Sequence, residues 1–437
     1  MNASFCSSPW FHIRITPDGG FLPCRWADRK LQSTHNIRDT SISEYMNSTE
    51  MVDLRMSLLG GKSPDICNAC YYEDSNNKVS GRQRQLLKSA ISVGNFDKSL
   101  CASPHYDLFN YSNVHHGCTN NLPVDVQIDL GSVCNSACIM CRPSYSTRLA
   151  SDYAKLSKKE PELFDAPKSC HNWTDTVELV DKFTTELLAI PNIKYIHFLG
   201  GETLYLRSFY DMCNRLIIGG VAKDINIGTT TNCTVYSHEL VNIIRNFKHV
   251  HVGLSVEGFH TINDYVRWPA SISDITENIF KFLEMREELG MHLALRITPN
   301  IFTIYHLDTV FDFMIQHSIS AESCDILYDP SCLRIELLPK ELILAALGKI
   351  NVIIRKHGLI PNTAIMINRR REDLVSDVIS DVIFEYKIFL ENCSPPTDVE
   401  AERYKLVKFI KAFESLRHNK IIDYLPEYEE FLRSYGY

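Results

Sequence analysis

The chain is organised around Cys134-Asn135-Ser136-Ala137-Cys138-Ile139-Met140-Cys141, which spaces three cysteines as C-x3-C-x2-C. This stretch follows an apolar, strand-like run at 126–130 and a turn at Gly131-Ser132. Three thiolates on one short loop can hold three irons of a four-iron cluster and leave the fourth iron open to a small chelating molecule. The same pattern also fits scattered buried thiols, or three ligands of a zinc site whose fourth ligand lies elsewhere.

Alternating strand and helix patterns surround this cysteine loop. Apolar, strand-like runs occur at 126–130, 194–199, 224–229, 249–256, 292–298 and 323–328. Amphipathic helical patterns separate them at 175–189, 204–217, 236–247, 271–289 and 303–317. Such alternation predicts a parallel sheet with an active site at the carboxyl ends of the strands. The cysteine loop is expected at that face, and the long segment 144–174 is expected to be an insertion.

Residues suited to a ligand follow the next strands as well. The second strand runs into Gly200-Gly201-Glu202, where glycines let the backbone approach a ligand and the glutamate can accept from an ammonium group. The third strand leads to Asn232. Ser255 and Arg267, at and after the end of the fourth strand, could bind a carboxylate or ribose hydroxyls. They could equally be a capping serine and a surface arginine.

A second set of cysteines lies near the N-terminus. Strand patterns at 11–15 and 21–24 flank the turn signal Pro17-Asp18-Gly19-Gly20, which predicts a β-hairpin. A helix is predicted at 42–59. The cysteines are Cys6, Cys24, Cys67 and Cys70. Four cysteines in two pairs predict a closed site for zinc or for an iron–sulfur cluster, and cysteine alone does not decide between the two.

The composition is that of an ordinary soluble protein, with 45% apolar and 22% charged residues. The net charge of −8 argues against a binder of nucleic-acid polymers, which normally carries a basic excess. We see neither a signal peptide nor an apolar run long enough to span a membrane, so we expect a cytoplasmic protein. In a reducing cytoplasm, its 15 cysteines are expected to bind metal more readily than to form disulfides.

The cysteine loop and the Gly-Gly-Glu turn one strand later resemble the core of radical S-adenosylmethionine (radical SAM) enzymes. The resemblance covers roughly residues 124–330 and implies a partial (β/α)6, TIM-like barrel. The N-terminal cysteines resemble a twitch or SPASM module, which usually follows the barrel but here precedes it. The domains expected are an α+β cluster-binding module at 1–80, a linker at 81–123, the barrel at 124–330 and a helical C-terminal region at 331–437.

The resemblance implies roles for individual residues. Cys134, Cys138 and Cys141 would ligate the catalytic [4Fe–4S] cluster, with S-adenosylmethionine on its open iron. The residues that would contact this molecule are Gly200, Gly201 and Glu202 at its amino group, Ser255 and Arg267 at its carboxylate or ribose, Asn232 at a turn where Cys233 replaces the usual glycine, and Met140, at a position often aromatic, near its adenine. The four N-terminal cysteines would hold an auxiliary [4Fe–4S] cluster.

The activity that the resemblance implies is reductive cleavage of S-adenosylmethionine to a 5′-deoxyadenosyl radical, which abstracts hydrogen from a substrate. We expect a peptide or an amino-acid-derived substrate, because auxiliary modules of this kind recur in peptide-modifying members, and an electron donor such as flavodoxin or ferredoxin. Two alternatives stay open. One is radical modification of a nucleotide or nucleobase, and the other is a non-catalytic zinc or iron–sulfur protein that binds a partner.

Overall fold

A single curved sheet forms the centre of the computed structural model, which describes residues 4–27, 34–75, 80–92, 96–167, 172–321, 326–361 and 375–437. Its eight strands follow the order β2-β1-β3-β4-β5-β6-β7-β8, and every neighbouring pair is parallel except β1 with β2. The strands are β1 (His12–Ile15), β2 (Phe21–Leu22), β3 (Asp125–Asp129), β4 (Tyr195–Leu199), β5 (Asn226–Thr231), β6 (His249–Ser255), β7 (His292–Arg296) and β8 (Ser320–Ala321). The predicted parallel sheet is confirmed.

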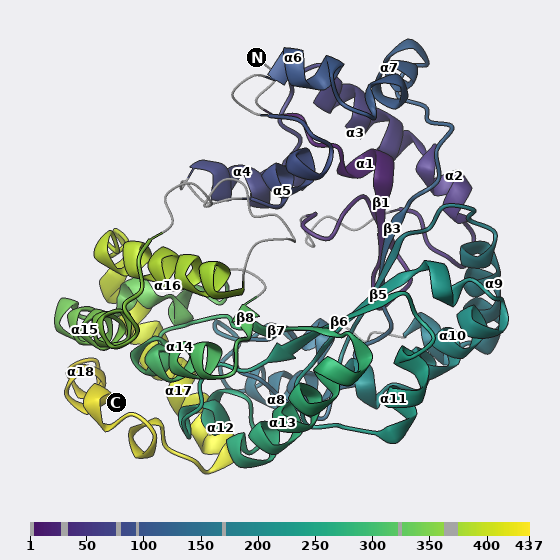
Figure 1. Ribbon diagram of the computed structural model, residues 1–437. Coiled ribbons are helices and arrows are strands. Elements are labelled where there is room, and N and C mark those ends of the chain that lie inside the picture. Colours follow the sequence, from purple (N-terminus) through teal and green to yellow (C-terminus); the bar gives the residue numbers. More distant parts are fainter. Residues whose placement is uncertain are drawn as a thin grey trace.

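Helices cover the outer face of this sheet, as Figure 1 shows. They are α9 (Val177–Leu188), α10 (Arg207–Ile218), α11 (His238–Ile244), α13 (Ile272–Leu289) and α14 (Leu307–Gln316). Local signals set their ends: the Ser237 hydroxyl accepts from the Leu240 amide at 3.2 Å to start α11, and Gly290, at φ +61°, ends α13. The alternation of strand and helix expected of a partial (β/α)6 barrel is confirmed for β3 to β8. The sixth strand was expected at 323–328; β8 ends at Ala321, and residues 322–325 lie outside the described residues.

The N-terminal hairpin is part of this sheet rather than a separate unit. Strand β1 pairs in parallel with β3, with His12 opposite Asp125 and Ile15 opposite Ile128. All four residues of β1 are buried, whereas its hairpin partner β2 has two residues. The backbone groups along both edges of a buried strand need hydrogen-bond partners. Strand β2 supplies them along one edge of β1, and β3 supplies them along the other.

Residues 81–123, which we expected to form a linker, hold helices that pack on the N-terminal core. The apolar residues of the N-terminal helices and of this segment form one core: Phe5, Cys6, Trp10, Leu54, Leu58, Leu86, Ile91, Phe96 and Phe109. The helices are α1 (Ser8–Phe11), α2 (Ile42–Met46), α3 (Thr49–Leu59), α4 (Asn68–Ser75), α5 (Gly81–Lys88), α6 (Phe96–Cys101) and α7 (Tyr106–Val114). In the structure, α5 to α7 are therefore a packed extension of the N-terminal module.

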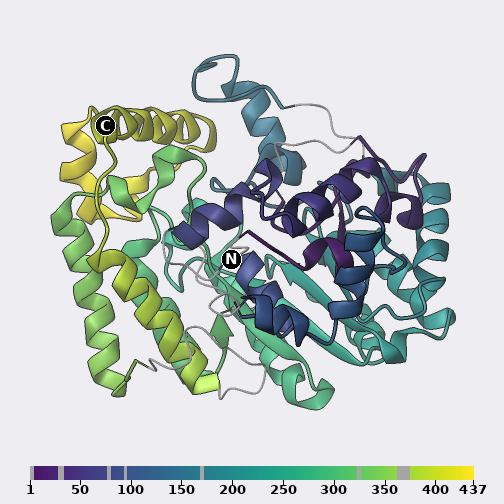
Figure 2. The same cartoon turned by 90° about the horizontal axis from the view of Figure 1, so that it is seen from above.

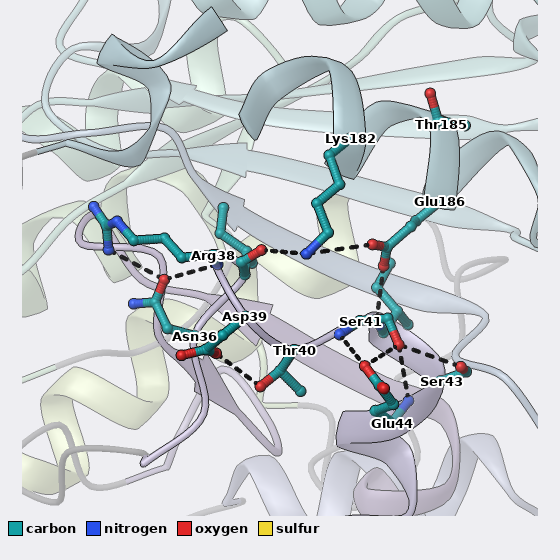
Figure 3. A network of polar contacts seen from close by, with 12 residues as sticks. Asn36, Arg38, Asp39, Thr40, Ser41, Ser43, Glu44, Lys182, Thr185 and Glu186 are labelled. Atoms are coloured by element: carbon teal, nitrogen blue, oxygen red, sulfur yellow. Dashed lines mark hydrogen bonds and ion pairs between the residues drawn. The ribbon is translucent and has the colours of Figure 1, made fainter. Parts of the chain in front are cut away.

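A polar network fixes this module on the barrel (Figure 3). The Lys182 ammonium of α9 donates to the Ile37 carbonyl at 2.7 Å, and the Glu186 carboxylate accepts from the Ile42 amide at 2.8 Å. Ser41 and Glu44 close a capping box at the start of α2 beside these contacts. The segment before α2 and the start of α2 are thus both bonded to α9 of the barrel.

The C-terminal helices gather at the β8 end of the sheet (Figures 1 and 2). They are α15 (Lys340–His357), α16 (Val375–Glu391), α17 (Val399–Arg417) and α18 (Glu429–Ser434), and the insertion after β3 and the segment after β6 add α8 (Thr147–Leu156) and α12 (Ile262–Val266). The predicted helical C-terminal region is confirmed over the described residues. None of the described helices combines the length and apolar character needed to cross a bilayer.

The junction of β1 and β3 predicts acid sensitivity. The His12 ring is 1% exposed, its Nε2 lies 3.6 Å from Asp125 Oδ1, and burial lowers the pKa of His12 to about 3. The unfolded chain, with a histidine pKa of about 6.5, binds this proton first, so stability falls as the pH falls from 6.5 toward 3, by about 1.4 kcal/mol per pH unit. We expect the melting temperature to fall less between pH 7 and 5 in His12→Gln than in the wild type.

The control is His249→Gln at an exposed histidine of β6, which should keep the wild-type pH dependence. An equally steep fall in His12→Gln and in the wild type would contradict the assignment to His12.

Candidate functional site

A cavity of about 290 Å³ lies at the carboxyl ends of the parallel strands. Its walls come from the ends of β3 to β6, from the segment after β7, from the cysteine loop and from β1. It is lined by all ten residues expected at the catalytic site: Cys134, Cys138, Cys141, Met140, Gly200, Gly201, Glu202, Asn232, Ser255 and Arg267. Residues separated by up to 133 positions in the sequence therefore share one chamber, at the face where the strand pattern predicts an active site.

Backbone hydrogen bonds hold the cysteine loop in place. The Ala137 amide donates to the Trp268 carbonyl at 2.7 Å, and the Ile139 amide donates to the Val266 carbonyl at 2.9 Å. Burial raises the pKa of Cys134 to about 12, with Cys138 and Cys141 adding to the effect. Iron binds the thiolate, so loading a metal at this site must release protons.

The three cysteines of the loop share one cavity but do not form the ligand group of a single metal ion. Within the described residues, no three or more Cys, His, Asp or Glu side chains converge as the ligands of one metal ion do. A tetrahedral zinc ion holds its sulfurs at about 2.3 Å from one centre, whereas a four-iron cluster spreads its cysteine ligands over a larger body. The three thiols line one cavity, as the ligands of one such cluster must.

The two glycines after β4 allow the end of that strand to contact the start of the cysteine loop closely. Gly200 and Gly201 have φ values of +107° and +52°, and the Glu202 amide donates to the Val133 carbonyl at 3.0 Å. A Cβ atom on Gly201 would lie 1.9 Å from the Val133 carbonyl oxygen. Close backbone contact with the loop, as well as access to a ligand, therefore requires glycine here.

Glu202 ties three segments of the site together. Its carboxylate accepts from the Asn232 amide at 2.6 Å and from the Thr231 hydroxyl at 2.7 Å, and burial raises its pKa. The Asn232 side chain in turn donates to Asn135 Oδ1 of the cysteine loop at 2.8 Å. The next residue, Cys233, adopts φ +62°, the left-handed conformation that glycine favours. The turn thus keeps its shape although cysteine replaces glycine.

Arg267 and Glu257 form an ion pair in the wall of the cavity. Arg267 Nη2 lies 2.5 Å from Glu257 Oε1, and the side chains are 11% and 1% exposed. The other carboxylate oxygen of Glu257 accepts from the Thr298 amide at 2.8 Å. Ser255, at the end of β6, lines the same wall. The carboxylate neutralises the guanidinium and fixes its orientation at the cavity.

Arg267→Gln should lower the free energy of unfolding by about 3–5 kcal/mol, because it removes the cationic partner of a buried ion pair. The double variant Arg267→Gln/Glu257→Gln should recover most of this loss. The control is Arg433→Gln at an exposed pair with Glu429, which should cost less than about 1 kcal/mol. Denaturant titration measures all three, and equal losses in the single and the double variant would contradict the prediction.

Three buried polar atoms at the cavity lack a hydrogen-bond partner among the described residues. They are Thr203 Oγ1, Thr230 Oγ1 and Arg267 Nε, all on residues that line the cavity. Buried polar groups in native proteins are normally paired, so unpaired atoms grouped in one cavity indicate a polar ligand. A three-thiol loop beside these atoms fits an iron–sulfur cluster with a polar molecule bound next to it.

The four N-terminal cysteines form a second, separate group. Cys24 and Cys67 have pKa values raised to about 12, first by burial and then by other cysteines of the same set. Cys6 and Cys70 likewise influence the other thiols of the set, and both are buried. Two of the four, Cys24 and Cys67, are partly exposed. The four thiols lie near enough to influence one another, which is what a closed site with four cysteine ligands requires.

The structure adds cavity residues that the sequence analysis did not identify: Arg14, Asp129, Tyr145 and Glu257. Arg14 Nε of β1 donates to Asp129 Oδ2 at 3.0 Å, and Arg14 Nη2 donates to the Tyr145 hydroxyl at 3.0 Å. Asp129 and Glu257 lie at or just after the ends of strands. This position in the sequence could have identified them as cavity residues. Arg14 carries no such signal, because its place depends on the long-range pairing of β1 with β3.

Comparison with known proteins agrees with this geometry. Residues 128–299 match the family model of the radical SAM superfamily, and residues 6–71 match that of SPASM, an iron–sulfur cluster-binding domain. The first range contains the cysteine loop and Arg267, and the second contains the four N-terminal cysteines. No curated protein sequence matches the chain.

Solved structures with some similarity include native anSMEcpe with bound AdoMet, at 17% identity and a TM-score of 0.38, over 54% of this chain and 62% of that chain. SuiB of Streptococcus suis bound to S-adenosylmethionine is 15% identical, with a TM-score of 0.29, over 72% of this chain and 61% of that chain. SuiB bound to precursor peptide SuiA is 14% identical, with the same TM-score of 0.29 and the same coverage of 72% and 61%. The chain thus spans about three-fifths of the length of these proteins.

Proposed function

Because the chain belongs to the radical SAM superfamily, we propose that it is a radical enzyme whose catalytic [4Fe–4S] cluster is held by Cys134, Cys138 and Cys141. The observation that carries the proposal is the meeting of these three cysteines, in one cavity, with unpaired buried atoms of Thr203, Thr230 and Arg267. When bound, the cluster and S-adenosylmethionine supply a 5′-deoxyadenosyl radical that can abstract hydrogen from a substrate.

The chain's own residues bind and orient the cofactors. The Arg267 guanidinium, fixed by Glu257, would attract the carboxylate of S-adenosylmethionine, and Ser255 offers a hydroxyl on the same wall. Gly200, Gly201 and Glu202 would bind its amino group. Met140 would cover the adenine, and Asn232 would order the adjoining turn through Asn135.

The walls of the cavity also protect a radical. Strand ends and the buried pair of Arg14 with Asp129 line the cavity, and such walls would limit the access of water and of side chains that react with the radical. Cys6, Cys24, Cys67 and Cys70 would hold an auxiliary cluster with all of its irons ligated by the protein. Such a closed site favours electron relay over direct binding of the substrate.

We propose a peptide or an amino-acid-derived molecule as the substrate, and a small redox protein such as flavodoxin or ferredoxin as the electron donor. The cluster-binding module at residues 6–71 supports the substrate class, since modules of this type recur in peptide-modifying members of the superfamily. SuiB, a protein of low similarity, has been solved with a precursor peptide.

The test is anaerobic reconstitution with iron and sulfide, followed by reduction in the presence of S-adenosylmethionine. We expect methionine and 5′-deoxyadenosine as products. Absence of 5′-deoxyadenosine from a protein that carries its full iron content would overturn the proposal, and so would a purified protein that binds only zinc.

A further inference from the structure

The C-terminal helix α17 reaches the cysteine loop through its last residue, Arg417. Arg417 Nη2 donates to the Ala137 carbonyl at 2.6 Å and to Asp152 Oδ2 of α8 at 2.9 Å. The side chains of Arg417 and Asp152 are 2% and 9% exposed. Since the Ala137 carbonyl belongs to the peptide bond that leads into Cys138, the guanidinium lies next to one of the three candidate ligands.

Aromatic rings enclose the same guanidinium. It lies over the Phe413 ring at 4.4 Å and over the Trp268 ring at 5.1 Å, and Arg148 lies over Trp268 at 5.2 Å. The Trp268 carbonyl accepts from the Ala137 amide at 2.7 Å. Arg417 itself binds the Ala137 carbonyl, and Trp268, whose ring Arg417 contacts, binds the Ala137 amide. The arginine therefore supports the loop at the residue before Cys138.

Arg417 keeps unpaired donor atoms besides its ion pair with Asp152. Its Nε and Nη1 atoms are buried and have no hydrogen-bond partner within the described part of the chain. Asp152 contacts the Nη2 atom alone. A buried positive charge beside an iron–sulfur cluster stabilises the reduced state, because one-electron reduction adds a negative charge to the cluster and a low-dielectric setting strengthens the attraction.

We propose that Arg417 is a positioning residue for the cysteine loop, and that its charge favours reduction of the cluster held by Cys134, Cys138 and Cys141. The inference rests on the proposed function. It assigns to the C-terminal helical region, whose sequence carries no recognisable motif, a direct effect on the redox chemistry of the barrel. Removing the charge should lower the equilibrium constant for reduction by about tenfold, which corresponds to about 59 mV for one electron.

The experiment is a redox titration of the reconstituted full-length protein, followed by electron paramagnetic resonance of the signal that changes when S-adenosylmethionine is added. Arg417→Gln should shift the midpoint potential of this signal to more negative values. Asp152→Asn should shift it to less negative values, because it removes the carboxylate that offsets Arg417. Arg417→Lys should restore most of the wild-type potential. Arg433→Gln, at an exposed arginine of α18, is the control and should leave the potential unchanged.

Opposite shifts in Arg417→Gln and Asp152→Asn would support the inference, since mere loosening of the loop would move both variants in the same direction. Unchanged potentials, or shifts of the same sign, would overturn it while the proposed function stands. If Arg417→Gln does not load iron, the midpoint potential of Asp152→Asn tests the inference alone: a less negative value supports it, and an unchanged or more negative value overturns it. A wild-type signal that does not respond to S-adenosylmethionine would overturn the proposed function and the inference together.

Discussion

Replacing Cys134, Cys138 and Cys141 together by alanine should remove about half of the iron and abolish the formation of 5′-deoxyadenosine. About four irons per chain should remain, because Cys6, Cys24, Cys67 and Cys70 form a separate group with its own donors. The remaining cluster should give a reduced spectrum that no longer responds to S-adenosylmethionine. Iron analysis, spectroscopy and product quantification measure the three effects.

The matched control replaces three cysteines outside the cavity and outside the N-terminal group: Cys213, Cys332 and Cys393. Cys213 and Cys332 are buried and Cys393 is half-buried, so this variant also loses packed thiols. It should keep its full iron content and form 5′-deoxyadenosine. The complementary variant Cys67→Ala/Cys70→Ala should lose the other half of the iron. Full iron content in the Cys134/Cys138/Cys141 variant would show that the loop holds no cluster.

Local patterns in the sequence were enough to predict the barrel and its candidate site. Alternating runs predicted the strands β3 to β7 and the helices between them to within a few residues, because each element carries its own periodicity and end signals. Parallel strands place their carboxyl ends at one face, so the cysteine loop, the Gly-Gly-Glu turn and Arg267 were expected together. The cavity brings these segments together.

Long-range pairing could not be predicted in the same way. Nothing in the sequence of β1 shows that it pairs with β3, more than 100 residues later, so Arg14 was not expected at the cavity. The same holds for Arg417, which lies 280 residues from Ala137, the residue whose carbonyl it binds. These contacts depend on the tertiary packing of segments far apart in the chain. The sequence of one segment alone does not specify that packing.

Gly201→Ala should lower the free energy of unfolding by about 3 kcal/mol or more and prevent loading of the cluster at the cysteine loop. The new Cβ would lie 1.9 Å from the Val133 carbonyl oxygen, and this backbone atom cannot move without displacing the start of the loop. The end of β4 and the loop would have to separate, with loss of the hydrogen bond from the Glu202 amide to Val133. The auxiliary cluster, bound elsewhere, should still load.

Gly290→Ala provides a control for the backbone conformation alone. Gly290 has φ +61°, close to the +52° of Gly201, but no atom lies within 4 Å of the position its Cβ would take. It should therefore cost only the strain of a left-handed alanine, about 1–2 kcal/mol, and leave both clusters loaded. The difference between the two variants measures the cost of the close approach itself. Equal losses of unfolding free energy in the two variants would mean that position 201 requires glycine for its backbone conformation only. The close contact between the end of β4 and the cysteine loop would then not explain the need for glycine.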